Sequence, residues 1–313
     1  MNILSTGSIY LDINTQLEGT HAHLDPEKEF VSRSYQTVLG GSAVIAPLAM
    51  AKLGLTPHFI GIIGQDDFGL LVSQKLEKSG IKSHLEINSF AQTNVGINRI
   101  DLSGQTYMDV LGNANSHLSP ETLQKVVDQE FDNMDLLYLG SVFKTPKLLE
   151  TFISTAKRFK QAGKLVFLDH GRVPASLTTE ETNATLKILM PFVTHYAPSE
   201  QDIHSAWQLN SATELIELLV RNYSGLTIHI KMGEKGSIIV SDNKPTEIAP
   251  YGIIDLSTQP NFVGAGDVSN AGFIYGLSQK LDSIKASKIA NHTAYLHISG
   301  RKITKAALQG VSL

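Results

Sequence analysis

Residues 261–273 read NFVGAGDVSNAGF, in which a Gly-Ala-Gly turn is followed by an acid and then by an apolar run. This order predicts that a helix begins at the turn. The first backbone N–H groups of a helix have no partner within it, and small residues let an anion approach them. The carboxylate of Asp267 is stabilised there by the helix dipole and could accept the proton of an attacking hydroxyl. On these residues alone, a phosphate-transfer site and a glycine turn capped by Asp267 are equally open.

The segments around this stretch alternate between two kinds of pattern. Short apolar runs, such as NILSTG at 2–7 and KLVFLD at 164–169, alternate with longer segments of helical period, such as GSAVIAPLAMAKLG at 41–54. This alternation indicates βαβ units, and therefore an α/β fold with a parallel sheet covered by helices on both faces. Because the chain shows no internal repeat and no linker, we expect one domain over residues 1–313.

Two segments, 13–38 and 91–112, leave this rhythm. In both of them Thr, Val, Ile and Tyr alternate with polar residues, which is typical of short strands with two different faces. We therefore expect a small β-sheet that projects from the main domain as a lid. An exposed edge of such a sheet offers a contact for a homodimer.

The amino-acid composition limits the kinds of molecule that this protein can bind. The 313 residues carry a net charge of -4 and no cysteine, which gives neither the basic field that nucleic acid requires nor any thiolate or disulfide chemistry. The first residues lack the charged and apolar regions of a signal peptide, and no apolar run is long enough to span a bilayer. We expect a cytoplasmic protein with a small-molecule partner, no nucleic acid and no membrane.

The motifs of this chain resemble those of the ribokinase family, the PfkB-type carbohydrate kinases. The resemblance runs nearly end to end, in the family's order, through residues 2–13 (NILSTGSIYLDI), 40–54 (GGSAVIAPLAMAKLG), 61–81 (GIIGQDDFGLLVSQKLEKSGI), 231–237 (KMGEKGS) and 261–277 (NFVGAGDVSNAGFIYGL). It implies a three-layer α/β core with a mostly parallel sheet, a small β-sheet lid, ATP as phosphoryl donor and Mg²⁺ as helper.

The resemblance also implies roles for individual residues. Asp267 would be the base that activates a substrate hydroxyl, beside an anion hole formed by Gly264, Ala265 and Gly266. Such a base and cradle are what phosphoryl transfer needs, because the reaction depends mainly on positioning and charge stabilisation. The remaining implied residues are Asp12, Gly40, Gly41 and Arg172 for the acceptor, Lys231, Gly233, Gly236 and Asn291 for the nucleotide, and Glu200 and Asp202 for the metal.

Simpler structural roles remain open for two of these residues. Asp12 is placed by the resemblance on the first strand, where it could merely cap the strand end. Lys231 could be a solvated residue at the end of its own strand, rather than a cation that screens phosphate charge. The pair His21 and His23 has no third ligand nearby, so we interpret it as solvent-facing rather than as a metal site.

Several positions depart from the family pattern. Where relatives that depend on a monovalent cation place an Asp and an oxygen-bearing side chain, this chain has Asn261 and Val263, with Phe262 between them, which predicts weak dependence on potassium. Ile45 and Tyr10 stand where relatives have polar side chains. They predict a less polar acceptor pocket, suited to a ring with an apolar face.

Two functions of different classes follow. The first is an ATP-dependent kinase that phosphorylates a hydroxyl of a small sugar, polyol or nucleoside. The second is a catalytically silent relative that binds a sugar or nucleotide as a sensor or partner protein. The intact GAGD sequence at 264–267 favours the enzyme, because a silent protein has no need for a carboxylate beside an anion hole.

Overall fold

Residues 1–17, 32, 34–101, 106–255 and 260–309 are described by the structure, a computed structural model of the chain. Parts of both lid segments, among them the pair His21 and His23, lie outside the described residues. The strands are β1 (Asn2–Gly7), β2 (Tyr10–Gln16), β3 (Ser34–Gly40), β4 (Thr56–Gly64), β5 (Lys82–Asn88), β6 (Val95–Ile100), β7 (Thr106–Leu111), β8 (Leu136–Gly140), β9 (Leu165–Asp169), β10 (His195–Tyr196), β11 (Thr227–Lys231), β12 (Ser237–Ser241) and β13 (Lys244–Ile248). The α-helices are α1 (Ser42–Lys52), α2 (Asp67–Glu77), α3 (Pro120–Glu130), α4 (Leu149–Gln161), α5 (Thr179–Leu189), α6 (Glu200–Trp207), α7 (Ala212–Asn222), α8 (Ala265–Ser278), α9 (Ser283–Ile298) and α10 (Lys305–Leu308).

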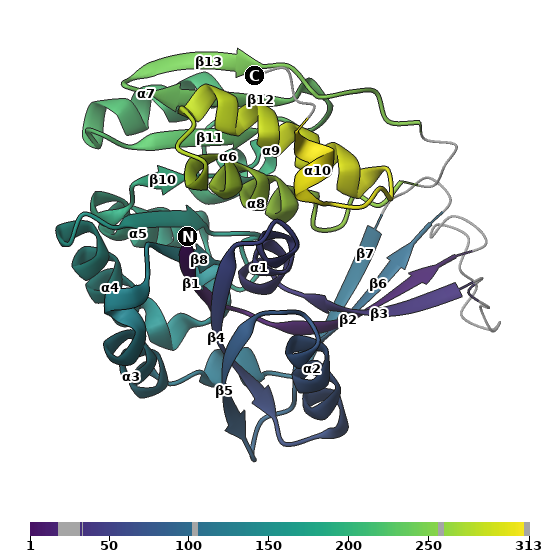
Figure 1. The fold of residues 1–313 in the computed structure, drawn as a ribbon. Helices are drawn as coiled ribbons and strands as arrows, with labels where there is room; N and C mark the ends of the chain where they lie inside the picture. The colour runs from purple at the N-terminus through teal and green to yellow at the C-terminus, as the bar shows by residue number, and fades with distance from the viewer. Residues whose placement is uncertain (18–31, 33, 102–105, 256–259, 310–313) are drawn as a thin grey trace.

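A nine-stranded sheet in the order β13-β12-β11-β10-β9-β8-β1-β4-β5 forms the centre of the molecule. The strands from β11 to β5 in that order are parallel, and β12 and β13 add antiparallel neighbours at one edge. Figure 1 shows α3, α4 and α5 on one side of this sheet and α1, α8 and α9 on the other. The predicted three-layer α/β core is confirmed.

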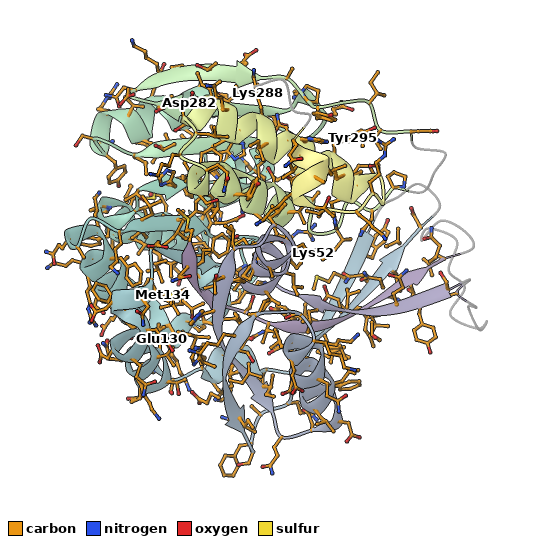
Figure 2. All side chains as sticks on the ribbon, in the orientation of Figure 1. Lys52, Glu130, Met134, Asp282, Lys288 and Tyr295 are labelled. Carbon is orange, nitrogen blue, oxygen red and sulfur yellow. The ribbon has the colours of Figure 1, made fainter. Side chains whose placement is uncertain are left out.

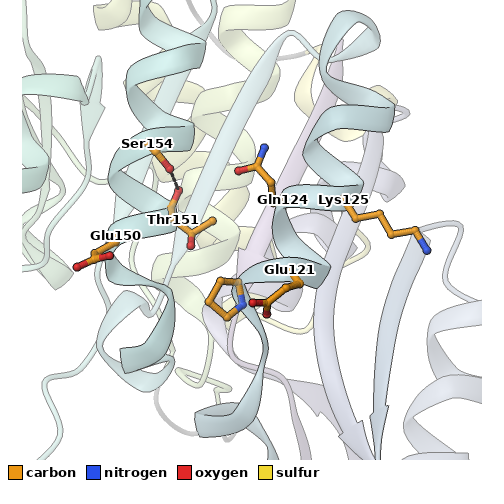
Figure 3. Close-up of a pocket in the computed structure, with 7 residues that line it drawn as sticks. Glu121, Gln124, Lys125, Glu150, Thr151 and Ser154 are labelled. Carbon is orange, nitrogen blue, oxygen red and sulfur yellow. Dashed lines mark hydrogen bonds between the residues drawn. The ribbon is translucent and has the colours of Figure 1, made fainter.

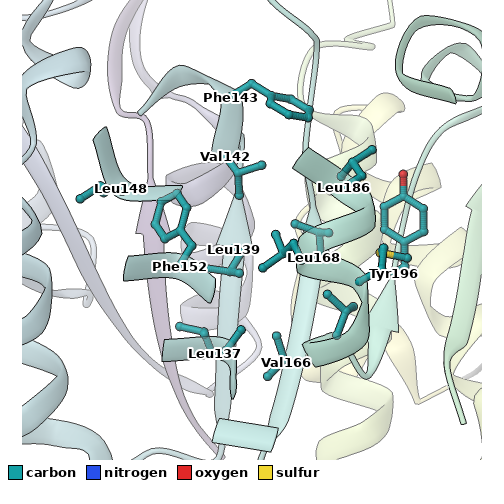
Figure 4. Packing of buried hydrophobic residues seen from close by; sticks show 14 of the residues in the cluster. Leu137, Leu139, Val142, Phe143, Leu148, Phe152, Val166, Leu168, Leu186 and Tyr196 are labelled. Carbon is teal, nitrogen blue, oxygen red and sulfur yellow. The ribbon is translucent and has the colours of Figure 1, made fainter. Parts of the chain in front are cut away.

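The apolar strands are buried because helices cover both faces of the sheet. All five residues of β8, LLYLG, are buried, and Leu137 and Leu139 pack with Val166 and Leu168 of β9 against Phe152 of α4 (Figure 4). The opposite face packs on α1, α8 and α9 through a second cluster. No helix of the described ranges is both long and apolar enough to cross a membrane.

A second sheet of four strands, in the order β3-β2-β6-β7, projects to the right of the main body in Figure 1. Strands β2 and β6 are parallel, whereas β3 and β7 pair antiparallel with them. The expectation of a small separate β-sheet is therefore confirmed. The placement of Asp12 on the first strand is wrong, since β1 ends at Gly7 and Asp12 lies within β2 of the second sheet.

The two faces of this second sheet differ, because successive side chains of a strand point to opposite faces. Leu11, Leu39 and Val95 pack with α1 and α2 in a buried cluster. The register aligns Asp12 with Val38 and Gly96, and Gly96 with Val110, on the other face. That face is open, since 36% of Val38 and 48% of Val110 are exposed.

Candidate active site

Two helices begin at the carboxyl ends of the parallel strands, α1 beside β1 and β8, and α8 beside β9 and β11. Gly41 precedes α1 with φ 93°, and Gly264 precedes α8 with φ 77°, a backbone region that favours glycine. A Cβ at Gly140, the last residue of β8, would lie 2.6 Å from the amide nitrogen of Ala43 in the first turn of α1. The chain therefore brings the start of α1 directly onto the end of β8, in the crevice where α/β sheets bind ligands.

The predicted helix start at 264–267 is present. Asp267 is the third residue of α8, and its backbone N–H and that of Gly266 make no hydrogen bond within the described ranges. The amide of Ala265 donates to the carbonyl oxygen of Phe262 at 3.2 Å, so it is not free for a ligand. The turn can thus offer the N–H groups of Gly266 and Asp267 to an anion.

The environment of Asp267 favours a protonated carboxyl more than solvent does. Burial raises the pKa of Asp267 above 3.8, and the negative charge of Asp169 raises it further. Lys231 and a hydrogen bond with Ser42 of α1 act in the opposite direction. Asp267 is nonetheless partly exposed, so its carboxylate can both reach a substrate and take up a proton near neutral pH.

Lys231 is ion-paired beneath the turn. Its Nζ lies 2.6 Å from Oδ2 of Asp169, and only 12% of the Lys231 side chain is exposed, so it is not a solvated residue at the end of β11. Asn270 of α8 donates from Nδ2 to the same Asp169 oxygen at 2.5 Å and to the hydroxyl of Tyr138 at 3.1 Å. A Cβ at Gly266 would lie 3.5 Å from Nζ of Lys231, which places this cation against the turn.

Asp12 occupies a recess between two glycines of neighbouring strands. A Cβ at Gly40 would lie 2.1 Å from one carboxylate oxygen of Asp12, and a Cβ at Gly96 would lie 2.3 Å from the other. Burial raises the pKa of Asp12 to about 6, and its Oδ1 has no hydrogen-bond partner in the described chain. A buried carboxylate without a donor is costly unless a ligand supplies one.

The residues implied for the nucleotide lie on β11, β12 and α9. Gly233 and Gly236 border the 3-10 turn Gly233–Lys235 (η7) between β11 and β12, with φ 61° and 90°. A Cβ at Gly236 would meet the carbonyl oxygen of Ile248 at 2.2 Å, so this glycine is required by the backbone packing. Asn291 donates from Nδ2 to the carbonyl oxygens of Ile248 and Ala249, at 3.3 and 3.0 Å, and so fastens β13 to α9.

The two acids implied for the metal begin α6, but they differ in their surroundings. Asp202 is buried and accepts hydrogen bonds from the backbone and the hydroxyl of Ser199, both at 2.7 Å. Its charge also acts on Asp267 and raises the pKa of that carboxyl. Glu200 is half exposed and pairs with Lys235 at 3.1 Å, on the solvent side of η7. Asp202 therefore faces the site more directly than Glu200.

Arg172 lies close to a second cation that the sequence analysis missed. Lys144 follows β8 and Arg172 follows β9, whose last residues Gly140 and Asp169 are aligned as parallel neighbours. Burial lowers the pKa of Lys144, and the charge of Arg172 lowers it further. Neither side chain is paired with a carboxylate in the part of the chain that the structure describes.

The loop before the turn is braced by side chains. Oδ1 of Asn261 accepts a hydrogen bond from the amide of Val263 at 3.1 Å, and Nε2 of His297 lies 2.7 Å from the carbonyl oxygen of Val263. Ile45 packs against the turn itself, because a Cβ at Gly264 would lie 3.1 Å from its Cγ2. These three side chains hold the approach to α8 from three sides.

A surface pocket of about 560 Å³ lies elsewhere, between α3 and α4 (Figure 3). Its lining residues are Pro120, Glu121, Gln124, Lys125, Glu150, Thr151 and Ser154, and none of them belongs to the site described above. The lining carries side chains of both charges and no buried polar group. This pocket is therefore not the candidate active site.

Comparison with known proteins places this geometry in a family. The pattern of the pfkB family of carbohydrate kinases matches residues 2–307. A ribokinase of Arabidopsis thaliana is 25% identical over 283 residues, which cover 87% of this chain and 69% of that protein. An ATP-dependent ribose-1-phosphate kinase of Halopiger xanaduensis is 25% identical over 310 residues, which cover 98% of this chain and 95% of that protein.

Solved structures agree with the fold. The ribokinase of Thermotoga maritima has a TM-score of 0.76 at 20% identity, with 99% of this chain and 98% of that chain covered. A ribokinase-type protein of E. coli, solved with ATP and Mg²⁺, has a TM-score of 0.78 at 17% identity, with 99% and 96% covered.

The chain belongs to the pfkB family of carbohydrate kinases. Membership of this family makes it an ATP-dependent phosphotransferase that acts on an alcohol group. Sequence reasoning did not find the roles of Asn270 and Tyr138, which are separated by 132 residues, or that of Lys144. Position relative to the carboxyl ends of predicted strands was the one signal that could have pointed to Lys144.

Proposed function

We propose that this protein transfers the γ-phosphoryl group of ATP to a hydroxyl of a small sugar, polyol or nucleoside, with Asp267 as the base. The observation that carries the proposal is the position of Asp267, a partly exposed carboxylate in the first turn of α8 beside two free amides and the Lys231 ammonium. A base, an anion cradle and a fixed cation at one point are the elements that in-line phosphoryl transfer uses.

In this proposal Asp267 takes the proton of the acceptor hydroxyl as the oxygen attacks the γ-phosphorus. The new O–P bond forms while the bond from the γ-phosphorus to the bridging oxygen breaks, and ADP leaves with the electron pair. The N–H groups of Gly266 and Asp267 stabilise the charge on the transferred group. Lys231 adds a positive charge beside Gly266, held in place by Asp169. Asp12 accepts hydrogen bonds from other hydroxyls of the acceptor through its unpartnered Oδ1.

The donor set at the start of α6 fits Mg²⁺, because it consists of carboxylate oxygens, which are hard ligands. Asp202 would hold the metal through water from its buried position, and Glu200 can join it because a surface ion pair such as Glu200–Lys235 is weak. When bound, Mg²⁺ neutralises charge on the donor phosphates.

The test of the proposal is phosphorylation of a panel of sugars, polyols and nucleosides with labelled ATP, by wild type and by Asp267→Asn. We expect the variant to lose turnover by about 100-fold or more and to keep ATP affinity, because a general base contributes about that much. Near-full turnover in the variant would reduce Asp267 to a helix cap. Ser278→Ala, at the far end of α8, serves as the control for substitutions in this helix.

Within the same proposal, the acceptor carries a negative charge. Lys144 and Arg172 are like charges at the ends of adjacent strands, and each interacts unfavourably with the other until an anion lies between them. A carboxylate or phosphate group on the acceptor would supply that anion. We expect sugar acids or sugar phosphates to outperform neutral sugars of the same ring, and Lys144→Met to raise KM for the charged acceptor while leaving kcat on a neutral one unchanged.

A further inference from the structure

Three side chains that are far apart in the sequence converge at the amino ends of β4 and β5. His58 is the third residue of β4, His84 is the third residue of β5, and Glu130 is the last residue of α3. One ring nitrogen of each histidine and one carboxylate oxygen lie within 4.8 Å of one another. The active site lies at the carboxyl ends of the parallel strands, so this cluster is at the opposite edge of the sheet. Figure 2 labels Glu130 at lower left, well away from Tyr295 of α9 at upper right.

The atoms of this cluster lack ordinary partners. Nδ1 of His58 and Nε2 of His84 are buried and make no hydrogen bond in the described chain. Nδ1 of His58 lies 3.7 Å from Oε2 of Glu130, and Nε2 of His84 lies 4.0 Å from Oε1, both beyond hydrogen-bond length. The His58 side chain is only 9% exposed, so water does not readily satisfy its nitrogen.

We propose that His58, His84 and Glu130 bind a divalent transition-metal ion, with Zn²⁺ as the best match. Two imidazole nitrogens and one carboxylate oxygen are a donor set that zinc uses with a fourth position left for water. Donor atoms on a tetrahedral zinc ion are roughly 3.3 Å apart, because each bond is about 2.0 to 2.1 Å long. The three donor atoms lie within 4.8 Å of one another, so side-chain rotations would have to bring them closer to reach that arrangement.

The surrounding charges favour a cation beside Glu130, and Lys82 is the side chain that would compete with a metal ion there. Glu130 ends α3, where the helix dipole is negative and disfavours a carboxylate that has no cation beside it. Nζ of Lys82 now supplies that charge, at 2.7 Å from Oε1, but the Lys82 side chain is 56% exposed and can swing into solvent. Bound zinc would replace Lys82 and join α3 to β4 and β5 through direct bonds. This site is independent of phosphoryl transfer.

The experiment is calorimetric titration of the chelator-treated full chain with ZnCl₂, in excess MgCl₂ so that oxygen-only sites are occupied by Mg²⁺. We expect one saturable zinc equivalent in the wild type, its loss in His84→Ala and in Glu130→Gln, and tighter binding in Lys82→Gln. The control is His204→Ala, an exposed histidine of α6, which should retain the equivalent. Co²⁺ bound to the wild type should show the visible absorption of a tetrahedral site, which the two loss variants lack.

Two outcomes would overturn the proposal. One is the absence of saturable zinc binding in the wild type. The other is an unchanged zinc equivalent in His84→Ala and Glu130→Gln, which would assign the binding to other histidines. Circular dichroism and thermal unfolding of the metal-free variants show whether a variant has lost only its zinc site or has failed to fold. Because Glu130→Gln keeps the side-chain volume, it provides the decisive comparison if His84→Ala is unstable.

Discussion

Three carboxylates near the site have pKa values that their surroundings move in different directions. Asp169 has a lowered pKa, because Lys231 and Asn270 stabilise its charge despite burial. Asp12 and Asp267 have raised pKa values, because burial dominates and neither carboxylate forms an ion pair within the described residues. In many active sites, two neighbouring acids have pKa values shifted in opposite directions, so that one acid keeps a structural role and the other takes part in the reaction. On that basis we expect Asp169 to position Lys231, and Asp267 to be the group that exchanges a proton.

The raised pKa of Asp12 predicts that Asp12→Asn stabilises the protein at neutral pH. The pKa rises from 3.8 to about 6, so between these values the folded state binds more protons than the unfolded state, and stability falls as pH rises. The Asn variant escapes this loss, which amounts to roughly 3 kcal/mol above pH 6. Urea unfolding at pH 4.5 and 7.5 measures it. An equal stability difference between variant and wild type at both pH values contradicts the prediction. We also expect KM for the acceptor to rise.

The raised pKa of Asp267 predicts where activity is lost in acid. Only the carboxylate can accept the hydroxyl proton, so kcat/KM should fall as pH drops through a pKa well above the ordinary 3.8 of this side chain. The rate profile of the free enzyme between pH 4.5 and 9 measures it, with acceptor far below KM. A kcat/KM that stays level down to pH 4.5 would show that burial and Asp169 do not act on Asp267 as described.

At the scale of elements, the ends of strands and the starts of helices create the site. The glycines that precede α1 and α8 let the chain turn sharply into both helices, α1 above the ends of β1 and β8 and α8 above those of β9 and β11. Ser42 of α1 hydrogen-bonds Asp267 of α8. Both dipoles therefore direct positive potential to the same point. The loop into α8 is fixed separately by Asn261 and His297, through the backbone of Val263.

This bracing strengthens the prediction that potassium matters little. His297 already occupies the carbonyl oxygen of Val263, and Asn261 uses its side-chain oxygen on the Val263 amide. Neither Asn261 nor Val263 carries the negative charge that would hold a monovalent cation. Titration with KCl against a matched ionic strength of a tetramethylammonium salt, at saturating ATP and Mg²⁺, should change kcat by much less than tenfold. A saturable tenfold activation, about 1.4 kcal/mol of transition-state stabilisation, would refute it. His297→Ala should lower kcat in either salt.

For the whole molecule, the sequence predicted the class of fold, but it did not predict the contacts between residues that lie far apart in the chain. Local patterns located the helix start at 264–267 and the small sheet, because both depend on neighbouring residues. They misplaced Asp12, since nothing local marks the break between β1 and β2. The pairing of Lys231 with Asp169 spans 62 residues and arises when β11 and β9 enter one sheet. That the chain forms one domain, and that it forms a dimer, stay predictions.

The open face of the second sheet suggests how a dimer would form. Val38 of β3, and Met108 and Val110 of β7, are apolar side chains on this face that expose 36, 39 and 48% of their surface. We expect a homodimer that covers this sheet, and Val110→Glu to yield a monomer by light scattering. The control is Ile188→Glu, which places the same charge on α5 at a residue that is 55% exposed. A monomeric wild type at assay concentrations would refute the expectation.

The bonds from Asn270 to Tyr138 and Asp169 join residues 132 and 101 positions apart. A ribosome delivers the chain from its amino end, so a nascent polypeptide that already carries β1, β8 and β9 still lacks the turn at 264–267. The strands can assemble before that and bury the face that α3, α4 and α5 cover, but the opposite face and the proposed transfer site are completed only when α8 leaves the exit tunnel and docks. If the proposed site is the site of turnover, incomplete chains cannot consume ATP. A chain truncated before residue 264 would then allow folding of the early strands to be studied without any turnover.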